Sequence, residues 1–410
     1  MTITREHCLG LDKRDPIAHA RDRFTLPSNI IYLDGNSLGA LPKAVAPRLA
    51  RAIEEEWGRG LIRSWNDAGW YRAPQRVGAK IAKLIGAAAD EVIVTDSTSV
   101  DLFKVLTGAL GLRPGRTKIL GIKDDFPTDA YIAGGVADLR GADFVRVEPA
   151  ALIEAIDKET AIVSLTHVNY RSGFIHDMRA ITAAAHAQGA LIVWDLSHSA
   201  GVLPLALNDV QADFAVGCGY KHLNGGPGAP AYVFAAKRHQ RAFQHPLTGW
   251  FGHADPFAFA PDFEAAPGME KLLTGTPPIL SFVALEAALD AFEGVEMNIV
   301  REKVENLTQL FIDLVDERLR DHRFALASPR ERTLRGAQVA LNHPEGYAIM
   351  QAVIARRLVG DFRAPDTVRF GFAPLYTRFV DVYDAVTIIE DVMASRAWDT
   401  PQFKARRAVT

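Results

Sequence analysis

A lysine stands inside the stretch GCGYKHLNGGPG (217–228), where an apolar run ends and a glycine-rich turn begins. The amine of this residue, Lys221, can act as a nucleophile and form a Schiff base with a carbonyl compound. In an ordinary surface loop the same side chain has no chemical role. The choice between these interpretations depends on which other side chains are expected at the same edge of the fold.

Three other groups follow predicted strands and could meet Lys221. Asp195 ends the almost wholly apolar run 190–194, so its carboxylate is expected to be partly buried and to need a cationic or hydrogen-bonding partner. Thr98 and Ser99 open a predicted helix, where hydroxyls and free backbone amides suit a phosphate. Phe126 follows another strand and can stack on a flat ring. Each feature also has a structural explanation, as a salt bridge, a helix cap or a core residue.

One cofactor, pyridoxal phosphate, uses all four features together. It needs an amine for a Schiff base, a carboxylate for its ring nitrogen, an aromatic plate, and hydroxyls at a helix start for its phosphate. The chain supplies them on successive strands in the order phosphate loop, aromatic, aspartate, lysine. The sequence has no glycine-rich nucleotide motif. The ordered set therefore favours pyridoxal phosphate, although each signal alone is weak.

The elements that must position these residues alternate between about residues 90 and 235. Alternating strands and helices favour a mainly parallel sheet covered by helices on both faces, with ligands bound beyond the carboxyl ends of the strands. The fold class is thus α/β. Strands are expected at 91–95, 117–122, 144–147, 161–166, 190–195, 213–219 and 229–234, and helices at 100–110, 128–139 and 177–188.

The two ends of the chain have a different pattern. Residues 1–45 are expected to be irregular and to pack across two domains. A large cofactor-binding α/β domain is expected at 46–285 and a smaller α+β domain at 286–410. Long helical patterns at 279–292, 298–319 and 379–395 and weaker strands at 337–342 and 367–372 indicate the second domain.

Composition narrows the class of protein. The 410 residues carry a net charge of −3, with no basic block that would indicate a nucleic-acid partner. The two cysteines, Cys8 and Cys218, make a disulfide framework unexpected. No apolar signal core or membrane-spanning run is present. These features predict a cytoplasmic protein with no membrane contact.

Longer motifs allow a narrower assignment, because the chain resembles the kynureninases, fold-type I pyridoxal phosphate enzymes of the class V aminotransferase group. The resemblance implies a seven-stranded-type sheet and hydrolysis of L-kynurenine to anthranilate and L-alanine through a Schiff base (aldimine), in tryptophan catabolism or NAD biosynthesis. The 3-hydroxy form is a second possible substrate. The motifs are YLDGNSLG (32–39), SWNDAGW (64–70), DSTSVDLFK (96–104), FPTD (126–129), WDLSHSAG (194–201), GCGYKHLNGGPG (217–228), GWFGH (249–253), LLTGTPP (272–278) and VRFGFAPLY (368–376).

The resemblance also implies roles for particular residues. Lys221 would hold the cofactor and act as the base at Cα, and Tyr220 would contact the phosphate region and transfer protons. Asp195 would pair with the ring nitrogen, with His198 beside it. Further cofactor contacts are implied for Thr98, Ser99, Phe126, Pro127, Thr128, Asp129 and Thr166.

Other implied residues bind the substrate or come from a second copy of the chain. Arg369 would hold the substrate carboxylate in a bidentate fork. Trp65 and Gly275 would contact the aryl group and resemble the kynurenine-preferring type. Trp250 and Thr276 would reach the cofactor site from the neighbouring subunit, which implies a homodimer. Arg363, Arg72 and Arg171 compete with Arg369 for the carboxylate, and Trp70 competes with Trp65.

Rival functions stay open on the sequence alone. A class V aminotransferase has the same cofactor features. A cysteine desulfurase would need a mobile reactive cysteine, and neither Cys8 nor Cys218 lies on a late loop. A non-catalytic regulator is expected to lose Lys221 or Asp195, and both are present. A metal-dependent hydrolase would have to use Asp195, His198 and His222.

Overall fold

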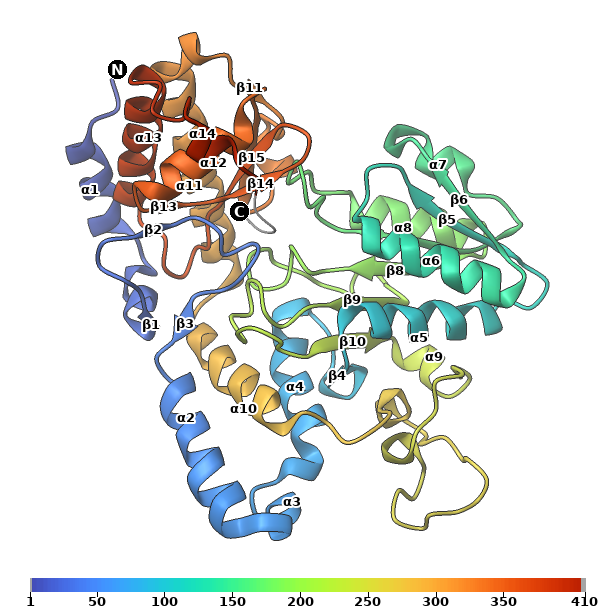
Figure 1. Cartoon of the computed structure of the whole chain (residues 1–410). Helices are drawn as coiled ribbons and strands as arrows, with labels where there is room; N and C mark the ends of the chain where they lie inside the picture. The colour runs from blue at the N-terminus through green and yellow to red at the C-terminus, as the bar shows by residue number, and fades with distance from the viewer. Residues whose placement is uncertain (1, 407–410) are drawn as a thin grey trace.

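The computed structural model describes residues 2–406, which are built around a seven-stranded sheet with the strand order β4-β10-β9-β8-β7-β5-β6 (Figure 1). Neighbouring strands are parallel except around β10, which runs antiparallel to both β9 and β4. The predicted mainly parallel sheet is confirmed. Its strands are β4 (Val92–Thr95), β5 (Lys118–Ile122), β6 (Asp143–Val147), β7 (Thr160–Thr166), β8 (Leu191–Asp195), β9 (Phe214–Gly217) and β10 (Ala231–Ala235).

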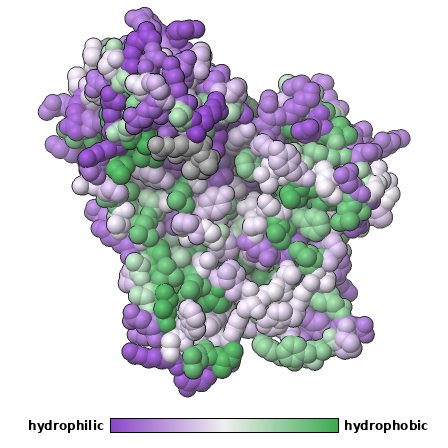
Figure 2. Space-filling view, in the orientation of Figure 1, coloured by the Kyte–Doolittle hydropathy of each residue, from purple (hydrophilic) through white to green (hydrophobic). Residues whose placement is uncertain are grey.

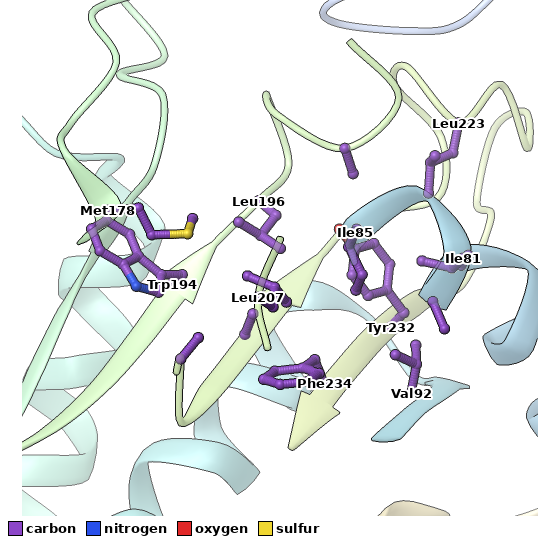
Figure 3. Packing of buried hydrophobic residues seen from close by; sticks show 14 of the residues in the cluster. Ile81, Ile85, Val92, Met178, Trp194, Leu196, Leu207, Leu223, Tyr232 and Phe234 are labelled. Carbon is purple, nitrogen blue, oxygen red and sulfur yellow. The ribbon is translucent and has the colours of Figure 1, made fainter. Parts of the chain in front are cut away.

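Helices cover both faces of this sheet. On β8, Ile192 and Trp194 belong to a buried cluster with α4 (Ala73–Ile85) and α8 (Met178–Ala187). Leu191 and Val193 point to the opposite face, where they join a cluster with α5 (Thr98–Gly111) and α6 (Pro127–Arg140). Successive strand residues point to opposite faces, so a strand buried on both sides must be apolar throughout. Figure 3 shows Trp194, Tyr232 and Phe234 on the α4 side of the sheet.

Local signals in the sequence fix several helix starts. Asp177 precedes α8 and accepts a hydrogen bond from the Ala180 amide at 2.9 Å, the N-cap arrangement that the sequence predicts. Pro127 occupies the first position of α6, where a missing N–H costs nothing. Shorter helices complete this part of the chain: α2 (Val45–Arg51), α3 (Ser64–Asp67), α7 (Leu152–Ala155) and α9 (Lys237–Gln240).

The C-terminal part forms an antiparallel sheet with the order β11-β12-β15-β14, packed against helices (Figure 1). Its core contains Phe311, Phe370 and Phe372, whose rings lie 5.2 Å apart in two pairs. The helices are α10 (Ile279–Ala288), α11 (Met297–Arg318), α12 (Gly346–Ala355), α13 (Phe379–Ala394) and α14 (Pro401–Lys404); the strands are β11 (Ala325–Leu326), β12 (Gln338–Asn342), β13 (Leu358–Val359), β14 (Asp361–Arg363) and β15 (Thr367–Gly371).

The expectation of an irregular N-terminus is wrong for residues 5–14, which form α1 (Arg5–Arg14). The helix has one buried residue, Cys8, so the sequence has no apolar stripe that would predict this helix. It is held by tertiary contacts instead. Asp12 accepts hydrogen bonds from the Phe379 and Val380 amides at 2.7 and 3.2 Å, which caps the start of α13.

The rest of the N-terminal segment runs past both sheets through β1 (Phe24–Thr25), β2 (Ile31–Tyr32) and β3 (Leu41–Pro42). The Gly371 amide donates to Leu33 O at 2.7 Å, and the Gly39 amide donates to Tyr220 O at 2.8 Å. A Cβ at Gly39 would lie 2.3 Å from Lys221 O, so only glycine allows this approach. Residues 33–39 therefore connect β15 to the chain around Lys221. In the described part of the chain, none of the helices is both long and apolar enough to span a bilayer.

A buried carboxylate, Asp213, ties the start of β9 to its neighbours. It accepts hydrogen bonds from the Ile192 amide at 2.9 Å, His186 at 2.8 Å, and His239 and Arg238 at 2.7 Å. Burial alone would raise the pKa of Asp213, but the bonds from His186, His239 and the Ile192 amide hold it well below its usual range. The carboxylate is therefore ionised in the folded protein.

We expect Asp213→Ala to lower the free energy of unfolding by about 2–4 kcal/mol at pH 7, because four donors lose their charged acceptor. Chemical denaturation measures this difference. A depressed folded-state pKa gives stability that is lost as pH falls, so the cost of the substitution should shrink below about pH 4. Asp209→Ala, at an exposed position nearby, is the control and should change the stability by less than about 0.5 kcal/mol. Equal effects of the two substitutions would contradict the role of Asp213.

Candidate active site

Lys221 lies just beyond the end of β9, where the structure gathers several of the predicted residues. Its Nζ is 3.1 Å from Nε2 of His198, 5.6 Å from the ring centroid of Phe126 and 5.9 Å from that of Tyr220. Lys221 and Phe126 are half-buried, whereas His198 is buried. The amine is thus held at a partly enclosed site beyond the carboxyl ends of the strands.

The glycine-rich turn after Lys221 packs closely against the sheet. The Asn224 amide donates to Lys221 O, and the Gly225 amide to Gly219 O, both at 2.9 Å. A Cβ at Gly219 would lie 2.4 Å from Pro230 O, so no larger residue fits. The chain can therefore leave the sheet abruptly while the lysine stays in place.

Two carboxyl groups, Asp195 and Asp129, meet beside the lysine. Asp195 is buried at the end of β8 and accepts a hydrogen bond from the Ser197 amide at 2.6 Å. Burial and the charge of Asp195 hold the pKa of Asp129 well above its usual range. Asp129 therefore keeps a proton, which it donates to Asp195. The pair carries one negative charge, which attracts a cation at this position.

A residue that the sequence reasoning missed, Asp125, holds Phe126 and Thr166 in place. Its Oδ1 accepts from the Thr166 hydroxyl at 2.6 Å and from the Phe126 amide at 2.8 Å, and its Oδ2 accepts from the Thr166 amide at 3.0 Å. Asp125 thus joins the end of β7 to the start of α6. Its position directly before the FPTD motif was the available signal.

His198 is a neutral, partly unsatisfied ring next to the amine. Burial and the charge of Lys221 hold its pKa well below the usual range. Within residues 2–406, its buried Nδ1 has no hydrogen-bond partner. His222, 6.3 Å away between ring centroids, is also buried, and burial lowers its pKa to about 3. An unpaired buried ring nitrogen costs free energy, which a polar group of a ligand would recover.

The start of α5 is the place where the sequence predicts an anion site. Ser97 is the N-cap residue, but its side chain makes no capping hydrogen bond. Thr98 and Ser99 are half-buried at the first two helical positions. At the start of α6, Thr128 is half-buried and Pro127 exposed. Free amides and hydroxyls at the α5 terminus suit a phosphate.

Arg369 lies deep on β15 and is already paired. Its Nε donates to Asp361 Oδ1 at 2.9 Å, and its Nη2 donates to Asp361 Oδ2 and to Ser37 Oγ, the latter at 3.0 Å. Its Nη1 donates to Tyr170 O. The sequence reasoning missed Asp361 and Ser37 as partners of Arg369. Ser37 is more than 300 residues from Arg369 along the chain, and Asp361 is on a different strand, β14.

The other arginines that compete for the carboxylate differ in position. Arg363 donates to the same Asp361 Oδ2 at 2.7 Å. Arg171 donates to Ala364 O at 2.6 Å and to the Tyr170 hydroxyl at 3.1 Å. Arg72 is exposed, with its guanidinium 5.4 Å from the Tyr71 ring centroid. Of these three, Arg363 alone shares the carboxylate partner of Arg369, Asp361.

A half-buried carboxyl of the N-terminal segment, Asp34, belongs to the same cluster. Burial and the charge of Asp361 raise its pKa to about 7, although Ser37, Arg369 and Arg363 oppose the shift. Among the described residues, its Oδ1 has no hydrogen-bond partner. Asp34 therefore carries a proton over most of the acidic range and loses it near neutral pH.

The structure does not bring the remaining predicted residues to Lys221. Trp65 packs 6.1 Å from both Trp70 and Phe251, measured between ring centroids, and Trp250 lies 4.9 Å from Phe251. Gly275 and Thr276 are exposed. Within the described chain, none of these four predicted residues makes a hydrogen bond, ion pair or ring contact with Lys221, His198 or Phe126.

The residues around Lys221 fit pyridoxal phosphate. The negative carboxyl pair suits a protonated ring nitrogen, the Phe126 face suits the ring, the α5 start suits the phosphate, and the orphaned Nδ1 of His198 suits a polar substituent. A metal site is not formed: residues 2–406 contain no group of three or more His, Cys, Asp or Glu side chains that could hold an ion.

Comparison with known sequences gives full-length matches. A family model described as the kynureninase C-terminal domain matches residues 300–389. A kynureninase of Burkholderia mallei is 50% identical over 414 residues, covering 99% of this chain and 100% of the relative. A kynureninase of Pseudomonas fluorescens is 48% identical with the same coverage. The resemblance carried by the motifs is confirmed.

Comparison with solved structures shows the fold. A cysteine desulfurase from Thermococcus onnurineus superposes with a TM-score of 0.78 at 21% identity, covering 92% of this chain and 98% of the other. A mutant of C-DES with glycine covalently linked to its PLP cofactor superposes with a TM-score of 0.77 at 15% identity, covering 95% and 100%. At such identities the likeness extends to the fold alone.

The titration of Asp34 gives a pH-dependent prediction for Asp34→Asn. Between about pH 4 and 7 the unfolded aspartate ionises while the folded one keeps its proton, so the wild-type protein loses stability as pH rises through this window. An amide cannot ionise. We therefore expect the variant to gain on the order of 2–4 kcal/mol relative to the wild type between pH 5 and pH 8. Denaturation at both pH values measures the gain.

The control is Asp22→Asn, at an exposed position of the same N-terminal segment. Its stability difference from the wild type should be the same at pH 5 and pH 8. If Asp34→Asn also shows a difference that does not change with pH, Asp34 does not titrate in this range.

Proposed function

The chain belongs to the kynureninase family, and we propose that Lys221 is the residue through which it hydrolyses L-kynurenine to anthranilate and L-alanine. It is a pyridoxal phosphate-dependent enzyme that cleaves the Cβ–Cγ bond of its substrate. The observation that supports the role of Lys221 is its Nζ, 3.1 Å from the neutral His198 and beside the Asp129–Asp195 pair. No other lysine of the described chain combines these neighbours.

When bound, pyridoxal phosphate supplies a carbonyl for the amine of the substrate and a ring that withdraws electrons from Cα. The chain supplies the other functions. Lys221 would remove and return the proton at Cα. Asp195, beside Asp129, would pair with the ring nitrogen and hold it protonated. Phe126, fixed by Asp125, would lie against the ring, and Thr98 and Ser99 would bind the phosphate.

Tyr220 is the proposed proton donor to Cβ after the Cβ–Cγ bond breaks. Burial raises its pKa, so its hydroxyl keeps the proton at neutral pH. The backbone of Tyr220 is fixed by the hydrogen bond from Gly39 at 2.8 Å. A donor must lie within reach of the carbon that it protonates, and Tyr220 is adjacent in sequence to the base.

We propose that the site is completed by a second copy of the chain. Trp250 and Thr276 would reach the partner's cofactor, and Trp65 and Gly275 would contact the aryl group of the substrate. The exposure of Gly275 and Thr276 supports this proposal. Hydrophobic side chains are also exposed on the stretch after α2: Ile53, Trp57, Leu61 and Ile62. Figure 2 shows hydrophobic surface gathered over α2 and α10.

We further propose a division into an N-terminal segment (1–45), a large cofactor-binding domain (46–285) and a small domain (286–410). The contacts of residues 33–39 with both β15 and Tyr220 support a segment that packs across both domains.

Two buried free cysteines support a location in the reducing cytoplasm. A preference for kynurenine over its 3-hydroxy form, and a role in tryptophan degradation, are proposed from the likeness to the bacterial family members.

The geometry does not favour the alternative of a desulfurase. Burial raises the pKa of Cys218 and, with the charge of Asp12, raises that of Cys8 to about 11. A desulfurase needs an accessible thiolate, and neither cysteine meets this requirement. An aminotransferase shares the cofactor site, so an assay with an added keto acid distinguishes it.

Lys221→Ala should abolish both the visible absorbance of lysine-bound cofactor and the release of anthranilate, because no other amine of the site can replace it. Absorption spectroscopy and anthranilate fluorescence after addition of L-kynurenine measure the two effects. Lys123→Ala, an exposed lysine paired with Glu148, is the matched control and should leave both unchanged. Turnover by Lys221→Ala at the wild-type rate would refute the assignment.

The shared site predicts complementation between two defective variants, Lys221→Ala and Trp250→Ala. In a mixed dimer, one site receives the intact lysine from one subunit and the intact tryptophan from the other. Random mixing, by co-expression, should restore about a quarter of the wild-type activity although each variant alone is nearly inactive. Activity equal to the average of the two separate variants would show that each site is built from one chain.

A further inference from the structure

Arg369 has little capacity left for an incoming carboxylate. A guanidinium has five N–H groups. Four are used: one on Nε and one on Nη2 with Asp361, one on Nη2 with Ser37, and one on Nη1 with Tyr170 O. A bidentate fork needs two parallel donors. With these partners kept, Arg369 can offer a carboxylate one N–H.

Arg363 lies beside it with unused donors. Its Nη2 donates to Asp361 Oδ2 at 2.7 Å and to Ser37 Oγ at 3.3 Å. Its Nε is buried and, in the part of the chain that the structure describes, without a hydrogen-bond partner. The side chain is 40% exposed, whereas that of Arg369 is 1% exposed, so Arg363 is at the solvent side of the cluster.

A short chain of contacts links the arginine cluster to Lys221: Arg369 donates to Tyr170 O, and the Tyr170 ring lies 5.4 Å from the ring of Phe126, which is 5.6 Å from Lys221 Nζ. The charges of Arg369 and Arg363 contribute to the low pKa of His198, and Arg363 opposes the rise in the pKa of Tyr220. The two side chains are therefore within electrostatic reach of the groups next to the amine. A substrate bound at Lys221 would place its α-carboxylate, one bond from Cα, near this edge.

The cluster carries a surplus of positive charge. Two guanidinium groups share one buried carboxylate, Asp361, whose side chain is 2% exposed. The other carboxyl of the cluster, Asp34, is protonated below about pH 7, because burial and the charge of Asp361 raise its pKa. Below about pH 7, two cations and one anion leave a net charge of about +1, which an anionic group of the substrate would neutralise.

We propose that Arg363 joins Arg369, to which the family resemblance assigns the α-carboxylate of the substrate, as a second donor to that carboxylate, and that Asp361 is the positioning residue that holds both. Asp361 fixes the two guanidinium groups through its two oxygens, and Ser37, which donates to Asp361 Oδ2 at 2.6 Å, locks the arrangement from the N-terminal segment. This inference rests on the proposed function, since it assigns the carboxylate end of the substrate of the same site.

The test compares ligands with and without the carboxylate. Arg363→Gln should raise the KM for L-kynurenine about tenfold or more, the effect of losing a charged hydrogen bond, with kcat within about threefold. The inhibition constant of decarboxylated kynurenine, which keeps the amine and the aryl ketone, should stay within about twofold of the wild type. Arg146→Gln, an exposed arginine on β6, is the control for the change in charge and should affect neither ligand.

Asp361→Asn should raise the KM at least as much as Arg363→Gln, because the amide carries no negative charge and has one acceptor oxygen in place of two, so Arg369 loses either its Nε or its Nη2 bond. Its effect on decarboxylated kynurenine should again be small. The Asp361 side chain is buried, so Asp361→Asn can also unfold the proposed small domain (286–410). Thermal melting of the variant checks whether it is folded. Arg363→Gln alters a partly exposed side chain and keeps the proposal testable if Asp361→Asn does not fold.

Two results would overturn the proposal. An unchanged KM in Arg363→Gln would assign the carboxylate to Arg369 alone. Equal weakening of both ligands would show that the cluster only supports the fold. Failure of the wild-type enzyme to release anthranilate would instead refute the proposed function. In that case calorimetric binding of L-alanine still tests the pair, with about tenfold weaker binding expected in Arg363→Gln.

Discussion

The hydrogen-bonded carboxyl pair Asp129–Asp195 is the interaction on which the site depends. Two acids in contact, of which Asp195 is buried and Asp129 half-buried, cannot both ionise at low cost, so one keeps a proton and the pair carries a single negative charge. This charge lies at the end of β8, among strands that are apolar on both faces. A buried anion needs a cation, and the neighbouring Lys221 and a protonated cofactor ring both meet that need.

The second constraint is the passage of residues 33–39 from β15 to the chain around Lys221. The backbone of Gly39 contacts Tyr220, and the side chain of Ser37 contacts Asp361 and Arg369. One short segment thus fixes the amine end of the site and its arginine end relative to each other. Proper spacing of these ends matters because the substrate must present Cα to the base while its carboxylate is held.

The fold of this chain and its family rest on different comparisons. The desulfurase and C–S lyase structures share its architecture at 15–21% identity, yet their chemistry differs. Relatives at 48–50% identity over the full length establish the family and with it the reaction. The difference between these enzymes therefore lies in their side chains and not in the arrangement of strands and helices.

The sequence by itself determined most strands of the large sheet, because the strands other than the edge strand β6 are buried on both faces and must be mainly apolar, and it determined which residues follow them. Lys221, Asp195, His198 and Phe126 meet at one edge because parallel strands end there together. The tertiary structure alone decided the rest. The pairing of Arg369 with Asp361 and Ser37, the protonated state of Asp129, and the helix α1 depend on contacts between distant segments and on burial. Neither distance in space nor the loss of water around a charge can be read from the order of residues.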